Sequence, residues 1–382
     1  MAFQDHLQFY LKNKISPVRQ DISDLQRHLD RRASLYQRLG VPRQFIKGRD
    51  VLEVGPGSGH NSLYVAACLP ARLDLVEPNP VARAGIVELY RQFKLEHTAP
   101  GIVPASLETF DGNLEYDFAI AEAWLGGVEH ELGLIRKLSA RVKPGGVLIL
   151  TLQSPVGMLA NMLRRLLACE LAFDLPDIRS QTQVLLAAFG AHLSTMKAMS
   201  RLHEDWIQDT LLNPAALTGV LTPAILLEIL PDFGVYETYP KIMTDWRWYK
   251  ELTGANRTLN RVLVECWRNQ THNFFNVHAP VVAAITEGDF NARLEAESQR
   301  LIDYLIECET RGIKPDRMSC RPGIQRIAGL LADARHPDAG SIVEFMAVYG
   351  KDRIDPAEVA AMPSFGKVFG RELVYISLIR DH

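Results

Sequence analysis

Three glycines stand at alternate positions directly after a short apolar stretch in the segment VLEVGPGSG, residues 51–59. The apolar stretch predicts a strand that is buried on both faces. Gly55, Gly57 and Gly59 allow a sharp turn and the close approach of a ligand, because no Cβ stands in the way. A helix expected at residues 60–69 would direct free N–H groups and the positive end of its dipole at that ligand. We therefore expect a ligand site over the glycines.

A carboxylate follows the next apolar stretch. The segment RLDLV at residues 72–76 predicts a second strand, and Glu77 and Pro78 come directly after it. An acid about 20 residues after a glycine turn is placed to hold a ribose diol. The dinucleotide fingerprint G-x-G-x-x-G would put its third glycine at position 60, where this sequence has His60. The spacing therefore differs from that of a dinucleotide site.

Four segments in this order resemble the motifs of the class I S-adenosylmethionine-dependent methyltransferases. They are VLEVGPGSG, LDLVEPNP, YDFAIAEAWL at residues 116–125 and KPGGVLIL at residues 143–150. The resemblance covers residues 49–152 and is specific to the superfamily, not to a substrate. It implies S-adenosylmethionine as the cofactor, S-adenosylhomocysteine as the product, and a doubly wound α/β fold. The expected sheet is mostly parallel and seven-stranded, with a large helical cap or insertion.

The resemblance also implies which residues hold the donor. The backbone at the three glycines would approach its amino-acid end, and Glu53 would help to order the loop. Glu77 would accept hydrogen bonds from both ribose hydroxyls, with Pro78 beside it, because a carboxylate suits that pair of donors. The alternative reading of Glu77 is a surface acid after a strand.

Adenine recognition departs from the family pattern. Many members carry an acid after the third strand, but here the segment is VPASLETF at residues 103–110, and Ser106 stands at that place. Recognition of the adenine then falls to Ser106, to the backbone around Leu107, or to Glu108. In the family pattern Glu122, after the fourth strand, lies near the donor. Trp124 either stacks on the acceptor or packs in the core.

Methyl transfer to a weakly acidic acceptor needs a base as well as alignment of the reactants. The candidates are His130, at the start of the helix after the fourth strand, and His203 in HEDW. A third is Asp245 in DWRWYK, where Trp248 and Tyr249 would contact the acceptor. The alternative for each histidine is an ordinary surface or core residue, and Trp248 could equally anchor the cap to the sheet. Three neighbouring residues diverge around a helix, so His203-Glu204-Asp205 predicts no metal site.

Composition restricts the class of protein. The 382 residues are 47% hydrophobic and 23% charged, which predicts a globular core with a sizeable addition. The formal charge of −3 argues against a nucleic-acid partner. No apolar run approaches 18 residues, so we expect no membrane span. Five scattered cysteines without a C-x-x-C pair, and no signal-peptide core, predict a reduced cytoplasmic protein.

The expected organisation follows the alternation of apolar stretches. A long amphipathic helix is predicted from Ser16-Pro17 to Gly40, because these residues are typical of a helix start and stop. The expected core elements are strand 51–54, helix 60–69, strand 72–77, helix 81–93, strand 101–104, strand 116–121, helix 128–141 and strand 147–152. The expected segments are residues 1–48 (helical), 49–152 (donor-binding core), 153–242 (helical cap and sixth strand), 243–365 (helical insertion) and 366–382 (closing antiparallel strand). A competing layout closes the sheet with residues 261–267 instead of 372–380.

The leading hypothesis is a methyltransferase acting on a hydroxyl of a small molecule, with a sugar or nucleotide-sugar as one class of acceptor. An N-P-P-Y-like tetrapeptide, typical of some amine methylation, is absent, since AEAW occupies its place at residues 121–124. The alternatives are C- or N-methylation of a small metabolite and a partner protein that binds the donor without turnover. Aminopropyl transfer is a further rival, for which the acidic cluster is missing. Assembly into a homo-oligomer stays open.

Overall fold

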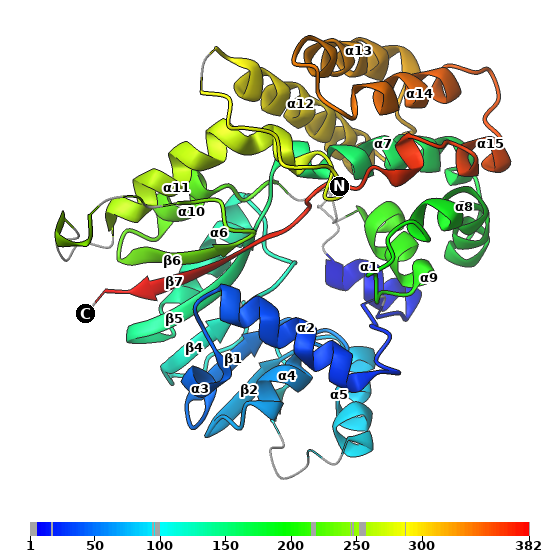
Figure 1. Cartoon of the computed structure of the whole chain (residues 1–382). Helices are drawn as coiled ribbons and strands as arrows, with labels where there is room; N and C mark the ends of the chain where they lie inside the picture. The colour runs from blue at the N-terminus through cyan, green and yellow to red at the C-terminus, as the bar shows by residue number, and fades with distance from the viewer. Residues whose placement is uncertain are drawn as a thin grey trace. The chain divides into compact units, whose positions relative to one another are not determined.

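The computed structural model describes residues 6–16, 18–93, 95, 100–214, 219–244, 246, 248–251, 257–286 and 288–381. The chain divides into two compact units. The first, here called the helical unit, comprises Met1–Arg19, Ser154–Thr218 and Arg268–Glu372. The second, the sheet unit, comprises Gln20–Gln153, Gly219–Trp267 and Leu373–His382. Figure 1 follows the chain through both.

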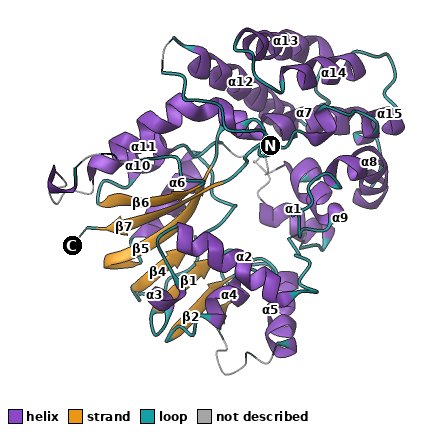
Figure 2. Cartoon of the chain, in the orientation of Figure 1, coloured by secondary structure: helices purple, strands orange, loops and turns teal. Residues whose placement is uncertain are grey.

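The sheet unit contains a seven-stranded sheet among the described residues, with the order β3-β2-β1-β4-β5-β7-β6. Its strands are β1 (Asp50–Val54), β2 (Arg72–Val76), β3 (Gly101–Val103), β4 (Tyr116–Ile120), β5 (Val142–Leu152), β6 (Phe233–Tyr239) and β7 (Val374–Arg380). The first five run parallel, whereas β7 is antiparallel to both β5 and β6. Figure 2 shows the strands in orange. The predicted doubly wound, mostly parallel sheet is confirmed.

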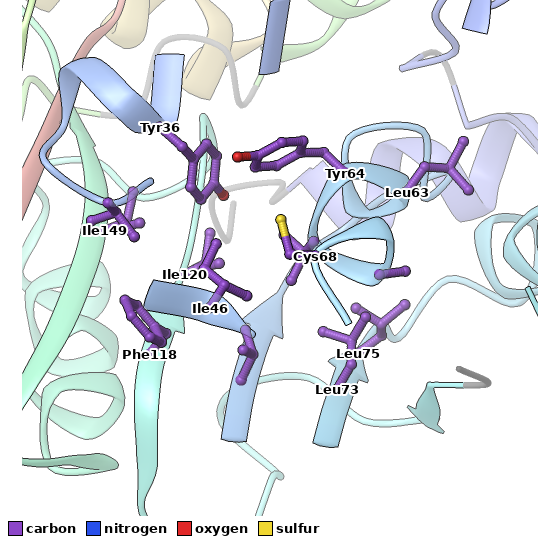
Figure 3. Close-up of a cluster of buried hydrophobic side chains, with 14 of the residues drawn as sticks. Tyr36, Ile46, Leu63, Tyr64, Cys68, Leu73, Leu75, Phe118, Ile120 and Ile149 are labelled. Carbon is purple, nitrogen blue, oxygen red and sulfur yellow. The ribbon is translucent and has the colours of Figure 1, made fainter. Parts of the chain in front are cut away.

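Helices pack on both sides of this sheet because strands and helices alternate along the chain. They are α2 (Leu25–Arg38), α3 (Arg43–Ile46), α4 (Ser62–Ala67), α5 (Pro80–Gln92), α6 (Glu129–Ser139), α10 (Pro223–Ile229) and most of α11 (Arg257–Gln270). Figure 3 shows part of the core, where Tyr36 of α2 and Tyr64 of α4 approach with ring centroids 5.1 Å apart. Apolar side chains of the strands, including Leu75, Phe118 and Ile149, complete this core.

The predicted start of the N-terminal helix is wrong. The helix α2 begins at Leu25, and the side chain of Asp24 accepts a hydrogen bond from the backbone N–H of Arg27. An aspartate cap of this kind accepts a hydrogen bond from one of the free N–H groups of the first turn. The sequence analysis expected Ser16 to have this position at the helix start. A separate short helix, α1 (His6–Asn13), belongs to the helical unit. The predicted stop is confirmed, because Gly40 adopts a left-handed conformation with φ of 73°.

The sheet is closed by β7, as the leading layout predicts, and not by residues 261–267. That segment lies within α11. Its apolar residues Leu263 and Trp267 are buried and stand four residues apart, which is the spacing of one helix face and not of a strand. The sixth strand expected at residues 233–240 is present as β6.

The helical unit is built around α7 (Pro155–Ala172), of which Leu159, Met162, Leu163, Leu166 and Leu167 are buried, as the sequence predicts for a core stripe. Its other helices are α8 (Ile178–Leu193), α9 (His203–Trp206), a π-helix (Ile207–Leu212), α12 (Phe290–Arg311), α13 (Arg317–Asp333), α14 (Ala339–Tyr349) and α15 (Pro356–Ala360). None of the described helices combines the length and apolar composition that crossing a membrane requires.

Candidate functional site

The glycine loop after β1 has the backbone conformation that its sequence predicts. Gly55, Gly57 and Gly59 have φ angles of 71°, 56° and 78°, in the left-handed region that disfavours any other residue. A Cβ on Gly55 would lie 2.7 Å from Nε1 of Trp124, and one on Gly59 would lie 2.8 Å from Cγ1 of Ile86. The loop therefore requires glycine both for its turn and for the close approach of its neighbours.

Glu77 joins the loop after β1 to the loop after β2. Its Oε2 accepts a hydrogen bond of 3.0 Å from the backbone N–H of Gly57, and its Oε1 accepts one of 2.8 Å from that of Asn79. The guanidinium of Arg83 donates to the carbonyl oxygens of Glu77 and Pro78, which fixes the start of the second loop. Glu77 is 5% exposed, and burial raises its pKa to about 7. A carboxylate thus lies at the carboxyl ends of two adjacent parallel strands.

Glu53 lies in β1 beneath this loop and is buried. Burial, and next the negative charge of Glu122, raise the pKa of Glu53 to about 7. Its Oε2 atom has no hydrogen-bond partner in the described part of the chain. The sequence-based role of Glu53 in ordering the loop stays a prediction.

Glu122 is held by two side chains of α2. Nη2 of Arg32 lies 2.6 Å from Oε1 of Glu122, and the Tyr36 hydroxyl donates to the same oxygen at 3.1 Å. The sequence analysis singled out neither Arg32 nor Tyr36 as part of the site. The i, i+4 spacing of these two residues, which puts them on one helix face, could have identified the pair.

The turn after β4 is strained at one residue. Ala123, between Glu122 and Trp124, has φ of 67°, which is unusual for a residue with a side chain. Such strain accumulates at functional sites when the surroundings hold it. Here the Ala123 N–H donates to Oγ1 of Thr151 at 2.9 Å, and the Trp124 indole N–H donates to the Val54 carbonyl at 2.9 Å. Trp124 is thereby fixed over the glycine loop.

Ser106 and Leu107 lie in a turn after β3. Ser106 exchanges hydrogen bonds with Thr109 through backbone and hydroxyl groups, and Leu107 is buried. Glu108 points to the surface, where its Oε1 lies 3.2 Å from Nε2 of His130. The structure therefore pairs two of the sequence candidates with each other, and the assignment of adenine contacts to this turn stays a prediction.

The predicted bases His130 and His203 belong to different units of the chain. The His130 side chain is 63% exposed, which matches the alternative reading of a surface histidine. His203 is the first residue of α9 and belongs to the helical unit. Asp245 lies outside the described residues, whereas Trp248 and Tyr249 are 59% and 69% exposed. None of the described candidates is hydrogen-bonded to the glycine loop, and their roles stay predictions.

A family model described as a methyltransferase domain matches residues 24–188. The matched residues include the glycine loop, Glu77 and the turn at Glu122. Among the described strands of the sheet, the antiparallel strand β7 lies between β5 and β6. Residues 24–188 are therefore a methyltransferase domain, in agreement with the resemblance of residues 49–152 to the class I S-adenosylmethionine-dependent methyltransferases. No curated protein matches the sequence.

Several solved structures are similar to this chain. One is an S-adenosylmethionine-dependent methyltransferase from Clostridium acetobutylicum, with 15% identity, a TM-score of 0.25, and coverage of 28% of this chain and 43% of that chain. Another is the CcbJ methyltransferase from Streptomyces caelestis, with 17% identity, a TM-score of 0.30, and coverage of 41% and 59%. A third is the N-methyltransferase NodS from Bradyrhizobium japonicum in complex with S-adenosylhomocysteine, with 17% identity, a TM-score of 0.29, and coverage of 38% and 74%. The chain spans less than two thirds of the first two.

The residues of the sheet unit fit S-adenosylmethionine. The left-handed glycine backbone, without Cβ atoms, lets a ligand approach the loop closely, and the buried carboxylate of Glu77 lies beside it through the hydrogen bond from Gly57. Both Glu53 and Glu122 keep one buried oxygen without a hydrogen-bond partner among the described residues. The described residues hold no group of three or more His, Cys, Asp or Glu side chains placed to bind a metal ion.

Proposed function

We propose that the protein transfers the methyl group of S-adenosylmethionine to a hydroxyl of a small-molecule acceptor, with a sugar or nucleotide-sugar as one class of acceptor. The observation that carries the proposal is the position of Glu77. Its two oxygens accept hydrogen bonds from the backbone of both loops at the carboxyl edge of the sheet. Ligands of open α/β sheets bind at that edge.

The donor supplies an electrophilic methyl carbon attached to a sulfonium. The chain then has to align the two reactants and exclude water, and alignment of this kind can lower a barrier by about 7–11 kcal/mol. We assign the ribose hydroxyls to Glu77 and the amino-acid end of the donor to the backbone of the glycine loop. Trp124, fixed by its hydrogen bond to Val54, would exclude water from one side of the loop.

The choice of a hydroxyl rests on the segment after β4. The AEAW sequence at residues 121–124 lacks the N-P-P-Y-like pattern of some amine methyltransferases. A net charge of −3 argues against a nucleic-acid acceptor. Methylation of a nitrogen or carbon atom is the alternative, and it predicts a different product from the same donor.

Calorimetry with four ligands tests the donor. We expect S-adenosylmethionine and S-adenosylhomocysteine to bind, and NAD and ATP not to bind, because the glycine spacing together with Glu77 matches the methyltransferase pattern. Binding of NAD without binding of S-adenosylmethionine would overturn the proposal.

Incubation with methyl-tritiated donor and a small-molecule cell extract then tests transfer. Nuclear magnetic resonance of the labelled product distinguishes a methyl ether from an N- or C-methyl group. Donor binding without any labelled product would favour a protein that binds the donor without turnover.

A further inference from the structure

Two carboxylates at the carboxyl edge of the sheet each keep one buried oxygen without a hydrogen-bond partner. They are Glu53 in β1 and Glu122 after β4, and the atom concerned is Oε2 in both, among the residues that the structure describes. The strands β1 and β4 are parallel neighbours, and Glu53 pairs in register with Ile120, two residues before Glu122. Both carboxylates belong to the sheet unit and form one site within it.

The two carboxylates share a single cation. Nη2 of Arg32 lies 2.6 Å from Oε1 of Glu122, and the Tyr36 hydroxyl donates to the same oxygen. Glu53 forms no ion pair with any residue that the structure describes. When both carboxylates are ionised, the group of Arg32, Glu53 and Glu122 therefore carries one negative charge in excess.

This excess charge lies close to the glycine loop. Gly55 follows Glu53 by two residues, and two residues span at most about 7 Å, so the chain keeps the backbone of Glu53 within that distance of the loop. On the other side of the site, the Trp124 indole N–H, from the same turn as Glu122, donates to the carbonyl of Val54. Val54 stands between Glu53 and Gly55. A ligand bound over the glycines therefore lies near both carboxylates.

Glu53 holds its proton unusually tightly. Two like charges in a buried site are unfavourable without a further cation, so one of the two carboxylates tends to stay protonated. Burial, and next the charge of Glu122, raise the pKa of Glu53 to about 7, whereas the Ser62 side chain and the Arg32 charge oppose the shift. At pH 7 this carboxyl is therefore about half protonated in the chain alone.

The other groups that face Glu53 do not change their charge near pH 7. Tyr36 of α2 and Tyr90 of α5 both interact with its charge, and burial holds the pKa of each phenol well above its usual value. Ser62 of α4 is uncharged, and β2 contributes the apolar register partner Leu75. Glu53 is therefore the group whose protonation responds to a charge placed beside this carboxylate pair.

We propose that Glu53 distinguishes the donor from the product by charge, being ionised beside the sulfonium of S-adenosylmethionine and protonated beside the neutral thioether of S-adenosylhomocysteine. The proposal rests on the donor binding of the proposed function and is independent of the acceptor. The two compounds share the adenine, the ribose and the amino-acid end, and they differ only in the methyl group and the charge of the sulfur. Charge is therefore the property by which a carboxylate can distinguish them.

The protons and charges of this exchange balance. Transfer of the methyl group turns the sulfonium into a thioether, so the bound nucleoside loses one positive charge. Glu53 takes up one proton from solvent, and the acceptor releases one proton to solvent when it gains the methyl group. The combined charge of the nucleoside and Glu53 stays the same. The product is then held without the attraction that holds the donor, which favours its replacement by a new donor molecule.

The variant E53Q removes the charge and keeps the size of the side chain. Opposite unit charges about 10 Å apart, at an effective dielectric constant of about 20, change an equilibrium constant by about tenfold. At pH 8 we therefore expect E53Q to bind S-adenosylmethionine about tenfold more weakly than the wild type, without any weakening of S-adenosylhomocysteine binding. The matched control is E129Q, which removes the same charge from a side chain that is 85% exposed and should leave both affinities unchanged.

Calorimetry in two buffers of different ionisation enthalpy measures the protons directly. At pH 7, on binding S-adenosylmethionine, the wild type should release about half a proton more than E53Q, because the sulfonium ionises Glu53. On binding S-adenosylhomocysteine it should take up about half a proton more than E53Q. Subtracting E53Q removes the titration of the ligand's amino group and of Glu77, since both proteins share them.

Infrared difference spectra of the wild type give a second measurement that needs no variant. The carbonyl stretch of a protonated carboxyl should be stronger in the S-adenosylhomocysteine complex than in the S-adenosylmethionine complex. Proton numbers that are equal in the wild type and E53Q for both ligands, or a carboxyl band of equal strength in the two complexes, would overturn the role of Glu53 and leave donor binding intact. A wild-type protein that binds neither ligand would contradict the methyltransferase function itself, and the role of Glu53 would fall with it.

Discussion

The guanidinium of Arg32 lies 2.6 Å from Oε1 of Glu122, so a buried ion pair joins α2 to the turn after β4. Both side chains are at most 10% exposed, and the Tyr36 hydroxyl donates to the same carboxylate oxygen. This pair places a helix from the start of the chain beside the loop that follows β4. It therefore couples the stability of α2 to the shape of the donor site.

Replacing Arg32 with alanine tests that coupling. The change leaves the Glu122 carboxylate buried without its cation, and breaking a buried pair in this way typically costs about 3–5 kcal/mol. We expect a loss of this size in urea unfolding monitored by circular dichroism. The matched control is Arg91→Ala, which removes an exposed ion pair with Glu88 and should cost much less, because solvent screens the pair. Equal losses of unfolding free energy for the two variants would show that burial does not increase the contribution of the Arg32–Glu122 ion pair to stability.

Replacing Glu77 with alanine tests the donor site. Hydrogen bonds to a charged group contribute about 1.5–3 kcal/mol, so calorimetry should show donor affinity weakened by that amount. Glu88→Ala is the control, because Glu88 is an exposed carboxylate on α5 that pairs with Arg91. A folded Glu77→Ala protein that binds S-adenosylmethionine as tightly as the wild type would remove Glu77 from the site.

The raised pKa of Glu53 makes stability depend on pH. Its folded-state pKa of about 7 lies above the ordinary value for a glutamate of about 4.3, so the folded state binds the proton more tightly than the unfolded chain. The stability from this group is present below about pH 4 and is lost as the pH rises to about 7. Glu53→Gln should therefore raise the free energy of unfolding at pH 8, by about 4 kcal/mol at most, with little gain near pH 4. Urea unfolding at both pH values measures this, and a gain that is larger at the low pH would contradict the assignment.

The contact between Gly370 and Gly157 predicts an asymmetry between two glycine substitutions. Gly370→Ala forces a Cβ to within 1.9 Å of a backbone oxygen, so it should lower the free energy of unfolding by about 2 kcal/mol or more. Gly329→Ala, inside α13 with open space around the site, should instead raise it by about 0.5–1 kcal/mol, because alanine favours a helix. Thermal unfolding of both variants measures the two changes in stability. Two changes of the same sign would contradict the close packing of Gly370 against Gly157.

The sheet and its glycine loop could be predicted because local chemistry determines them. Residues 51–59 combine an apolar run with glycines that must be left-handed, and no distant contact is needed to recognise that pattern. The start of α2 could not be recognised in the same way. Ser16 and Asp24 are both good caps, and only the packed structure shows that Asp24 is used.

The polar contacts of the site depended on residues far apart in the sequence. Arg32 meets Glu122 across 90 positions, so no spacing rule connects them. His130 had been chosen for its place at the start of the helix after the fourth strand, and it proved to pair with Glu108 on the surface. Residue type identifies what a side chain can do, whereas the fold decides what it can reach.

The position of β7 also affects how the chain is completed during synthesis. In the order β5-β7-β6, the only described neighbour of β6 is β7, which follows it in the chain after the residues of the helical unit between 268 and 372. A ribosome adds about 5–20 residues per second, so β6 waits on the order of ten seconds for its partner. During that interval both β5 and β6 present open edges of the kind to which other chains add strands. A nascent chain of this protein should therefore depend on chaperones until Val374–Arg380 emerges.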